Sequence, residues 1–295
     1  MSAGAEAALR FETYRAALAR HAYRMLGERA ESEDVVQEAY VRWATAARAA
    51  DIRDDAAFLR TTVTRLCIDR LRAARTRRET YVGPWLPEPI VGCDGDDPAA
   101  VAALADDVSF ALLLVLERLS PLERAAFLLH DVMAVPFVEV AQTLGRSEEA
   151  VKQLASRARR HVRRPRERVT ESTAAQRRLR DRFAAAIVGG DLAGLQSLLT
   201  DDVVFVSDHG GKVPSATVPV TGADHVGRLL LGLARKAPGD MRISAASING
   251  APGFVFEQAG AVVQTLALDV EEDAIVAIYV VRNPDKLSSL RCFGP

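Results

Sequence analysis

The chain of 295 residues contains only three cysteines and no hydrophobic run long enough to cross a membrane. Cys67, Cys93 and Cys292 are far apart and lack the paired spacing of a zinc site, so we expect plain core or loop residues. The first residues contain no apolar segment like that of a signal peptide. A phosphate-binding glycine loop and a nucleophile elbow are also missing, so ATP use and hydrolase chemistry are not indicated. These absences predict a cytoplasmic protein with no metal, no cofactor and no membrane partner.

The formal net charge of −1 conceals a strong local asymmetry. Between residues 142 and 180 the basic side chains far outnumber the acidic ones, which is typical of a surface that binds nucleic acid. The chain is also long enough for two or more domains, each with a core of its own.

Residues 137–164 have the pattern of two short helices joined by a tight turn. The first helix is expected to end at Gly145, because glycine best adopts the left-handed conformation of such a turn. Ser147 then caps the second helix, whose apolar residues recur at spacings of three and four and leave an arginine-rich face outward. A helix-turn-helix places this face in the major groove of DNA, where Lys152 or Arg157 matches the acceptors of guanine. The residues that we predict to bind DNA here are Ser147, Lys152, Ser156, Arg157 and Arg160.

The alternative for this segment is an ordinary helical hairpin with a solvated basic face. The preceding residues favour the DNA-binding interpretation. Ser120, Pro121 and Glu123 combine a cap, a proline at the first helical position and a capping box. An apolar run follows, so residues 105–164 are predicted to form a compact helical domain that ends with the basic helix.

The segments SPLER at residues 120–124 and AVPFVEVAQTLGRSEEAVKQLASRARR at residues 134–160 resemble region 4 of extracytoplasmic-function (ECF) RNA polymerase sigma factors. Residues 32–43, predicted to start a helix at a Ser32 cap, are similar to the region 2 helix of that family that binds the clamp of the polymerase largest subunit. On this helix a polar stripe lies along one side by the three-and-four rule. A solvated helix face is the alternative. The predicted polymerase-binding residues are Asp34, Gln37, Glu38 and Arg42.

Residues 58–78 are predicted to form a helix with a buried apolar stripe and an arginine-rich end. Some of these arginines complement the helix dipole, but their number favours contact with DNA phosphates. By resemblance, this helix and the loop at residues 50–56 hold the downstream promoter element as it melts. Four charged loop residues are equal candidates for a base contact: Asp51, Arg53, Asp54 and Asp55. The helix residues that we assign to DNA are Arg70, Arg72 and Arg75.

The chain changes character after Pro165, where a polar stretch extends to Thr173. Helices are expected at residues 174–188, from an Asp191 cap to Leu199, and at residues 223–235. Strands are predicted at residues 203–207, 242–248, 254–257, 262–270 and 275–281, which are rich in Val, Ile and Phe and bounded by turn residues. This order resembles the SnoaL-like, NTF2-like fold, in which a curved sheet wraps around a pocket. The predicted fold class is therefore multidomain: two all-α domains followed by an α+β, NTF2-like/SnoaL-like cone-shaped domain.

Three short motifs narrow the resemblance to ECF sigma factors with a fused SnoaL-like domain, similar to the sigma factor J type. They are WLPEP at residues 85–89, SDHGGKV at residues 207–213 and NPDKL at residues 283–287. The usual family form of the second motif is DGGGK, so His209 departs from it. The resemblance implies that the fused domain regulates in cis and that these motifs hold the promoter-reading domains. A loop that covers a local hydrophobic patch is the alternative for the first motif. The implied interdomain residues are Trp85, Leu86, Pro87, Asp208, Lys212, Asn283, Pro284, Asp285, Lys286 and Leu287.

The predicted domains are a sigma region 2 at residues 1–80, a linker at 81–104, a sigma region 4 at 105–168 and a SnoaL-like regulatory domain at 174–295. We expect a sigma factor that binds core RNA polymerase and promoter DNA and is not an enzyme. A small-molecule ligand of the C-terminal domain is a further candidate partner. One alternative is a ligand-sensing DNA-binding regulator that never joins polymerase. A second is a SnoaL-like isomerase or cyclase that uses Asp208, His209 or Asp285 as a base, although both aspartates also fit turn and helix-start roles.

Overall fold

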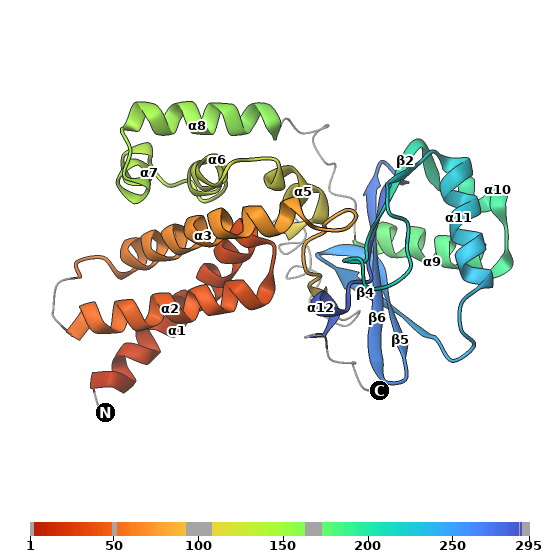
Figure 1. The fold of residues 1–295 in the computed structure, drawn as a ribbon, viewed down its shortest axis with the longest axis horizontal. Coiled ribbons are helices and arrows are strands. Elements are labelled where there is room, and N and C mark those ends of the chain that lie inside the picture. The colour runs from red at the N-terminus through yellow and green to blue at the C-terminus, as the bar shows by residue number, and fades with distance from the viewer. Residues whose placement is uncertain (1–2, 49–51, 93–107, 163–172, 289, 291–295) are drawn as a thin grey trace. The chain divides into compact units, whose positions relative to one another are not determined.

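A computed structural model describes residues 3–48, 52–92, 108–162, 173–288 and 290. The chain divides into two compact units. The first comprises Met1–Glu79 and Leu112–Arg164, and the second comprises Thr80–Ala111 and Pro165–Pro295. The segment that connects the two helical groups in sequence therefore belongs to the second unit. Figure 1 shows the elements of both units. Within these described ranges, no helix is both long and apolar enough to cross a membrane.

Three long helices begin the first unit: α1 (Ala3–Leu26), α2 (Arg29–Arg48) and α3 (Asp55–Glu79). The predicted Ser32 cap is wrong, because α2 starts earlier. Gly27, with a φ of 72°, ends α1, and the chain re-enters a helix directly after it. Ser32 lies inside α2, is buried, and donates its hydroxyl to the Glu28 carbonyl oxygen at 2.6 Å. Its side chain thus satisfies a local backbone acceptor instead of capping.

Helix α3 begins at Asp55, earlier than predicted, because acidic loop residues cap it. The Asp54 carboxylate accepts from the Ala57 N–H at 3.0 Å. Asp55 accepts from the Trp43 indole N–H at 2.9 Å and pairs with Arg10. Burial alone would raise the pKa of Asp55, but these two hydrogen bonds hold that pKa below its usual value. Two of the four charged loop residues therefore have structural partners, whereas Asp51 lies outside the described residues.

The second helical group contains α5 (Phe110–Glu117), α6 (Pro121–Phe127), the π-helical turn η1 (Leu128–Val132), α7 (Phe137–Leu144) and α8 (Glu148–His161). The predicted capping box is confirmed, since the Ser120 hydroxyl accepts from the Glu123 N–H and the Glu123 carboxylate accepts from the Ser120 N–H at 3.1 Å. Gly145 adopts the expected left-handed conformation, with a φ of 60°. Ser147 caps α8 by accepting from the Ala150 N–H at 3.2 Å. The helix-turn-helix therefore forms where predicted.

The two helical groups pack into one unit around α3, which contacts α6 and α7 as well as α1 and α2 (Figure 1). Arg65 of α3 donates to the carbonyl oxygens of Gln142 and Thr143 at 3.0 and 2.8 Å, so it satisfies acceptors at the C-terminal end of α7. Arg60 pairs with Glu139 at 2.8 Å. None of these contacts was predicted, because they join residues that are far apart in sequence.

The second unit is built on a seven-stranded sheet with the order β1-β4-β5-β6-β7-β2-β3. Its strands are β1 (Val91–Gly92), β2 (Leu199–Asp208), β3 (Val220–Thr221), β4 (Arg242–Ile248), β5 (Ala251–Gln258), β6 (Ala261–Glu271) and β7 (Ala274–Val281). Neighbouring strands are antiparallel except β2 and β7, which are parallel. The helices are α9 (Thr173–Gly189), α10 (Leu192–Gln196), α11 (Ala223–Arg235) and the short α12 (Pro284–Leu287).

One face of this sheet packs against α9, α10 and α11 (Figure 1). Phe183 and Leu230 from the helices share this core with Phe254 and Leu268 from the strands. Alternate residues of the strands lie on the other face, because side chains of a strand point to opposite sides. There the Phe110 ring, which is buried, lies 5.5 Å from the Tyr279 ring. The second face is therefore covered at Tyr279 by a residue close to the C-terminal end of the connecting segment.

Most predicted elements of the α+β unit are confirmed, and α11 and β4 have the predicted bounds. Asp191 caps α10 as expected, with its carboxylate accepting from the Gly194 N–H at 2.9 Å. Leu199 was assigned to that helix, but it begins β2, where it pairs with Ile275. The two-residue strands β1 and β3 were not predicted, since such short pairings depend on a partner strand and not on local residue preference.

Candidate functional site

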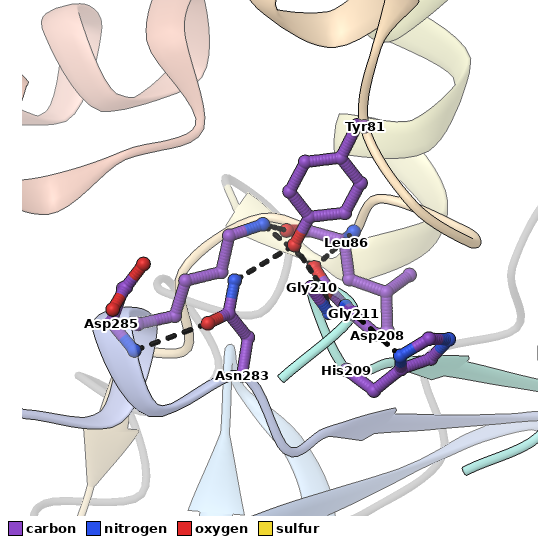
Figure 2. Close-up of polar contacts among 9 residues, drawn as sticks. Tyr81, Leu86, Asp208, His209, Gly210, Gly211, Asn283 and Asp285 are labelled. Carbon is purple, nitrogen blue, oxygen red and sulfur yellow. Dashed lines mark hydrogen bonds and ion pairs between the residues drawn. The ribbon is translucent and has the colours of Figure 1, made fainter. Parts of the chain in front are cut away.

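Residues 80–92 of the connecting segment lie in the second unit, and their contacts form the candidate site. We call residues 80–92 the linker and the residues that bind it, Asp208, Asn283 and Lys286, the docking site. The linker adds β1 to the sheet edge, where Val91 pairs with Ile248. The docking residues come from the end of β2 and from α12 with its cap. Figure 2 shows Asp208 and Asn283 close to Tyr81 and Leu86 of the linker.

The Asp208 carboxylate is the centre of the docking site. It is fully buried and accepts from the Tyr81 hydroxyl at 2.5 Å and from the Leu86 N–H at 2.9 Å (Figure 2). It also accepts from the Gly210 N–H at 3.2 Å, which closes the turn after β2. Burial and the hydrogen bond to Asp208 raise the pKa of Tyr81, so its hydroxyl stays protonated and donates. One carboxylate thus binds two positions of the linker.

Lys286 supplies the positive charge that compensates this buried carboxylate. Its ammonium lies 2.7 Å from the second oxygen of Asp208 and also donates to the Leu86 carbonyl oxygen. The same ammonium lies over the Trp85 ring, 4.2 Å from its centroid, and 5.3 Å from the Tyr81 ring centroid. Lys286 is only 8% exposed, so the pair with Asp208 is poorly screened by water. Linker and docking site are therefore joined by a buried charge pair.

Asn283 positions Lys286 by capping α12. Its side-chain oxygen accepts from the Asp285 N–H at 3.1 Å, and its amide nitrogen donates to the Tyr81 hydroxyl at 2.8 Å (Figure 2). Pro284 occupies the first helical position, as a helix start favours. Lys212 and Asp285 form a second pair at 2.5 Å, but this pair is exposed and joins two parts of the second unit without contacting the linker. Only one of the two pairs therefore bears directly on docking.

His209 lies against the linker where the family motif has glycine. Its ring is buried, its Nδ1 accepts from the Gly211 N–H at 3.0 Å, and its Nε2 lies close to Gly83. A Cβ at Gly83 would lie 2.6 Å from that nitrogen, so the histidine requires glycine opposite it. Gly83 also has a φ of 82°, which favours glycine independently. The departure at His209 is thus accommodated by the linker.

The structure brings together most of the residues predicted from the three motifs. Trp85, Leu86, Asp208, Asn283 and Lys286 interact directly, and Pro87 and Leu287 are buried in the same unit. Sequence reasoning missed Tyr81, although it stands only four residues before the WLPEP motif. It also missed Asn249, which follows β4 and precedes Gly250. An Asn-Gly pair between two predicted strands is a turn signal that would have marked this position.

The arrangement is suited to binding and not to acid–base catalysis. The Asp208 carboxylate is occupied by Tyr81, Leu86 and Lys286, and the Asp285 carboxylate is paired with Lys212. His209 holds a backbone N–H with one ring nitrogen. Among the residues that the structure describes, no group of His, Cys, Asp or Glu is arranged to hold a metal ion.

Helix α8 presents the predicted DNA-binding face. Val151, Ala155 and Ala158 are buried against α6 and α7, and the opposite side is exposed. A shallow groove runs along that side, lined by Glu149, Lys152, Gln153, Ser156, Arg157 and Arg160. Lys152 already pairs with Glu148 at 2.6 Å, an exposed contact that DNA can displace. Ser147 serves as the cap of α8 at the start of the same helix. Four of the five predicted residues therefore share one groove.

The predicted polymerase-binding stripe is on the exposed side of α2. Asp34, Gln37 and Arg42 are exposed and Glu38 is half-buried, whereas Val35, Ala39 and Trp43 are buried as expected. Arg42 pairs with Glu38 at 2.6 Å. The stripe is therefore available as a surface of the first unit.

The basic end of α3 is only partly described. Arg70 is 40% exposed and lies 3.6 Å from Glu38, so it links the two predicted surfaces. Arg72 is exposed and pairs with Asp69 at 3.5 Å. The side chain of Arg75 lies outside the described residues.

Comparison with known proteins agrees with these features. The family models Sigma-70 region 2 and Sigma-70, region 4 match residues 10–77 and 109–162. The chain is 41% identical over 293 residues to the ECF RNA polymerase sigma factor SigJ of Mycobacterium tuberculosis H37Rv, across 94% of this chain and 92% of the relative. It is 34% identical to the probable ECF RNA polymerase sigma factor SigI of the same species, across 95% and 94% of the two chains.

The crystal structure of M. tuberculosis SigJ matches with a TM-score of 0.75 at 40% identity and covers 97% of this chain and 98% of that one. Together with the observed elements, this match confirms the predicted fold class of two helical sigma regions followed by an α+β domain. The identity along nearly the full length, the two sigma region models and the helix-turn-helix all lead to one conclusion: the chain belongs to the family of extracytoplasmic-function RNA polymerase sigma factors.

Proposed function

We propose that this sigma factor is regulated in cis by its C-terminal domain, residues 174–295, which binds the linker. The observation that carries the proposal is the buried pair of Lys286 and Asp208, because both members also bind Leu86. In this assignment residues 1–80 bind core polymerase and help to melt the promoter, and residues 105–168 read the upstream, minus-35 element. Residues 81–104 connect the two.

Docking would shorten the tether between the two promoter-reading regions. The described part of region 2 ends with α3 at Glu79, and the region 4 match begins at residue 109. Released and extended, the connecting chain would span roughly 100 Å at about 3.3 Å per residue. Bound at Tyr81 and Leu86, it is held almost from its first residue. A docked linker therefore restrains how far the two regions can separate, and its release should favour engagement of two promoter elements.

Reading of the upstream element is assigned to the exposed groove of α8. A guanidinium or ammonium group in the major groove can donate to the O6 and N7 acceptors of guanine. Arg157 and Lys152 lie within this groove, and Ser156 and Arg160 extend it. We assign Arg70, Arg72 and Arg75 of α3 to phosphates of the downstream element, since such contacts supply affinity without reading sequence.

Binding of core polymerase is assigned to the stripe of Asp34, Gln37, Glu38 and Arg42. Its charges are exposed or half-buried and lie on one side of α2, so a partner can reach them together. Sigma factors are not enzymes, and family membership therefore confirms the prediction that the chain is not one. A small-molecule ligand of the C-terminal domain stays a prediction, as does a cytoplasmic location.

The test is in vitro transcription with core polymerase and a template that carries the region upstream of the protein's own gene. The full chain is compared with Lys286→Met, which breaks the buried pair, and with Lys212→Met, which breaks the exposed pair. We expect more transcript from Lys286→Met and no change from Lys212→Met. Equal transcript from all three proteins would refute regulation through the docking site. If all three bind DNA but none initiates, a ligand-sensing DNA-binding regulator becomes the better interpretation.

A further inference from the structure

The turn between β4 and β5 contains a buried asparagine that the three motifs do not include. Asn249 and Gly250 both have positive φ, 51° and 76°, as in a tight two-residue hairpin. Asparagine tolerates this conformation better than most residues. A hairpin turn is ordinarily at the surface, but Asn249 is fully buried. Something other than solvent must therefore satisfy its amide.

The partners of Asn249 are the two ends of the connecting segment. Its backbone N–H donates to the Ile90 carbonyl oxygen at 2.8 Å, and its side-chain oxygen accepts from the Ile90 N–H at 2.9 Å. Its side-chain N–H donates to the Val108 carbonyl oxygen at 2.9 Å. Ile90 precedes β1, whereas Val108 lies directly before the residues matched by region 4. One side chain thus joins the chain that leaves region 2 to the chain that enters region 4.

An amide is the group that these two contacts require. One end presents a backbone donor and the other a backbone acceptor, and only a side chain with both functions satisfies the pair. Aspartate would keep the acceptor for Ile90 but place an oxygen against the Val108 carbonyl. Both ends are well covered, since Val108 is fully buried and the adjacent Phe110 packs on Tyr279. A backbone group left unpaired there costs more than the hydrogen bond itself contributes.

We propose that Asn249 is a positioning residue that clamps both ends of the connecting segment onto the regulatory domain. Among the described residues, the docking site of Asp208 and Lys286 binds the first end, through Tyr81 and Leu86. Asn249 couples this end to the second, so that release of the segment for initiation requires both to open. Its regulatory consequence rests on the function proposed above, whereas the clamp itself does not.

The test is amide hydrogen exchange by mass spectrometry on the full chain. Asn249→Gly removes both side-chain contacts, and glycine retains the positive φ and the backbone N–H. Ala259→Gly is the matched control, because Ala259 has the same φ of 51° in the β5–β6 turn but is exposed. We expect exchange in residues 86–92 and in residues 108–111 to increase at least about tenfold in Asn249→Gly relative to the control. Faster exchange confined to the β4–β5 hairpin, or to one end alone, would overturn the clamp.

A second variant separates the two ends. Asn249→Asp should release residues 108–111 more than residues 86–92, because it preserves the acceptor for Ile90. Equal release of both ends would overturn the assignment of the two contacts. In transcription with core polymerase, Asn249→Gly should change transcript in the same direction as Lys286→Met. An unchanged transcript despite faster exchange at both ends would overturn the regulatory consequence. If the wild-type chain does not initiate at all, the proposed function fails, while the exchange experiment still decides the clamp.

Discussion

The buried pair of Lys286 and Asp208 makes a quantitative prediction for the substitution Lys286→Met. Methionine approximates the aliphatic stem of lysine but removes the ammonium, so Asp208 stays in a site that is 0% exposed without its counter-charge. Removing one partner of a buried pair costs roughly 3–5 kcal/mol. Asp208 retains hydrogen bonds from Tyr81, Leu86 and Gly210, so we expect the lower end, about 3 kcal/mol. Loss of the contact with the Trp85 ring adds about 0.5–2 kcal/mol.

Hydrogen exchange of the linker is the appropriate assay, because undocking need not unfold either unit. The loss of about 3 kcal/mol from the pair alone corresponds to an increase of roughly 100-fold in local opening. Exchange in a peptide that contains Leu86 should therefore accelerate by at least that factor in Lys286→Met, since its amide is bound to Asp208. Lys212→Met is the control: its pair with Asp285 is 51% and 64% exposed, and such pairs contribute about 0–1 kcal/mol.

Two results would refute this reasoning. If Lys286→Met and Lys212→Met accelerate exchange at Leu86 equally, burial does not increase the contribution of the Lys286–Asp208 pair to docking of the linker. The second result comes from the double variant Asp208→Asn, Lys286→Met, in which the uncompensated charge is removed as well. Its linker should exchange more slowly than that of Lys286→Met. Faster exchange in the double variant would show that the hydrogen bonds, and not the charge, hold the linker.

Three further predictions concern other parts of the chain. Arg157→Ala should weaken binding to promoter DNA by about 1–3 kcal/mol and weaken binding to unrelated DNA less. The control is Arg159→Ala, because the Arg159 side chain pairs with Asp131 at 2.6 Å. Equal losses on both DNAs would indicate a phosphate contact. Trp85→Ala should increase protease sensitivity of the second unit, and unchanged sensitivity would remove Trp85 from docking. Burial lowers the pKa of His21 to about 4, so the unfolded chain binds more protons between about pH 6.5 and pH 4. The contribution of His21 to the free energy of unfolding of the first unit should be fully present above about pH 6.5, and about 3 kcal/mol of it should be lost as the pH falls to about 4. In urea titrations, His21→Gln should reduce this loss. Parallel pH profiles of the wild-type chain and the variant would contradict the assignment.

Local signals in the sequence predicted many of the elements. The capping box of Ser120 and Glu123 and the left-handed Gly145 depend on neighbouring residues, and both formed as expected. Helix α11 kept its predicted bounds because its apolar residues repeat at a helical spacing between Gly222 and Lys236. Ser32 shows the limit of such signals. It is a residue type that favours a helix cap, but it lies inside α2 because α1 ends before Gly27 and α2 starts soon after it. Leu199 likewise lies in a strand and not in the predicted helix, because it pairs with Ile275 of β7.

The features of the candidate site likewise fall into those that local sequence predicts and those that depend on tertiary structure. The sequence by itself determined the motifs WLPEP and NPDKL, the basic face of α8 and the glycines that the turns require, because each of these depends on residue types within one short segment. The tertiary structure alone decided that Tyr81 and Leu86 meet Asp208 and Lys286, and that Asn249 binds both Ile90 and Val108. Such contacts join positions that are far apart in sequence, and they arise only when the sheet brings strand ends together and excludes water from their polar groups.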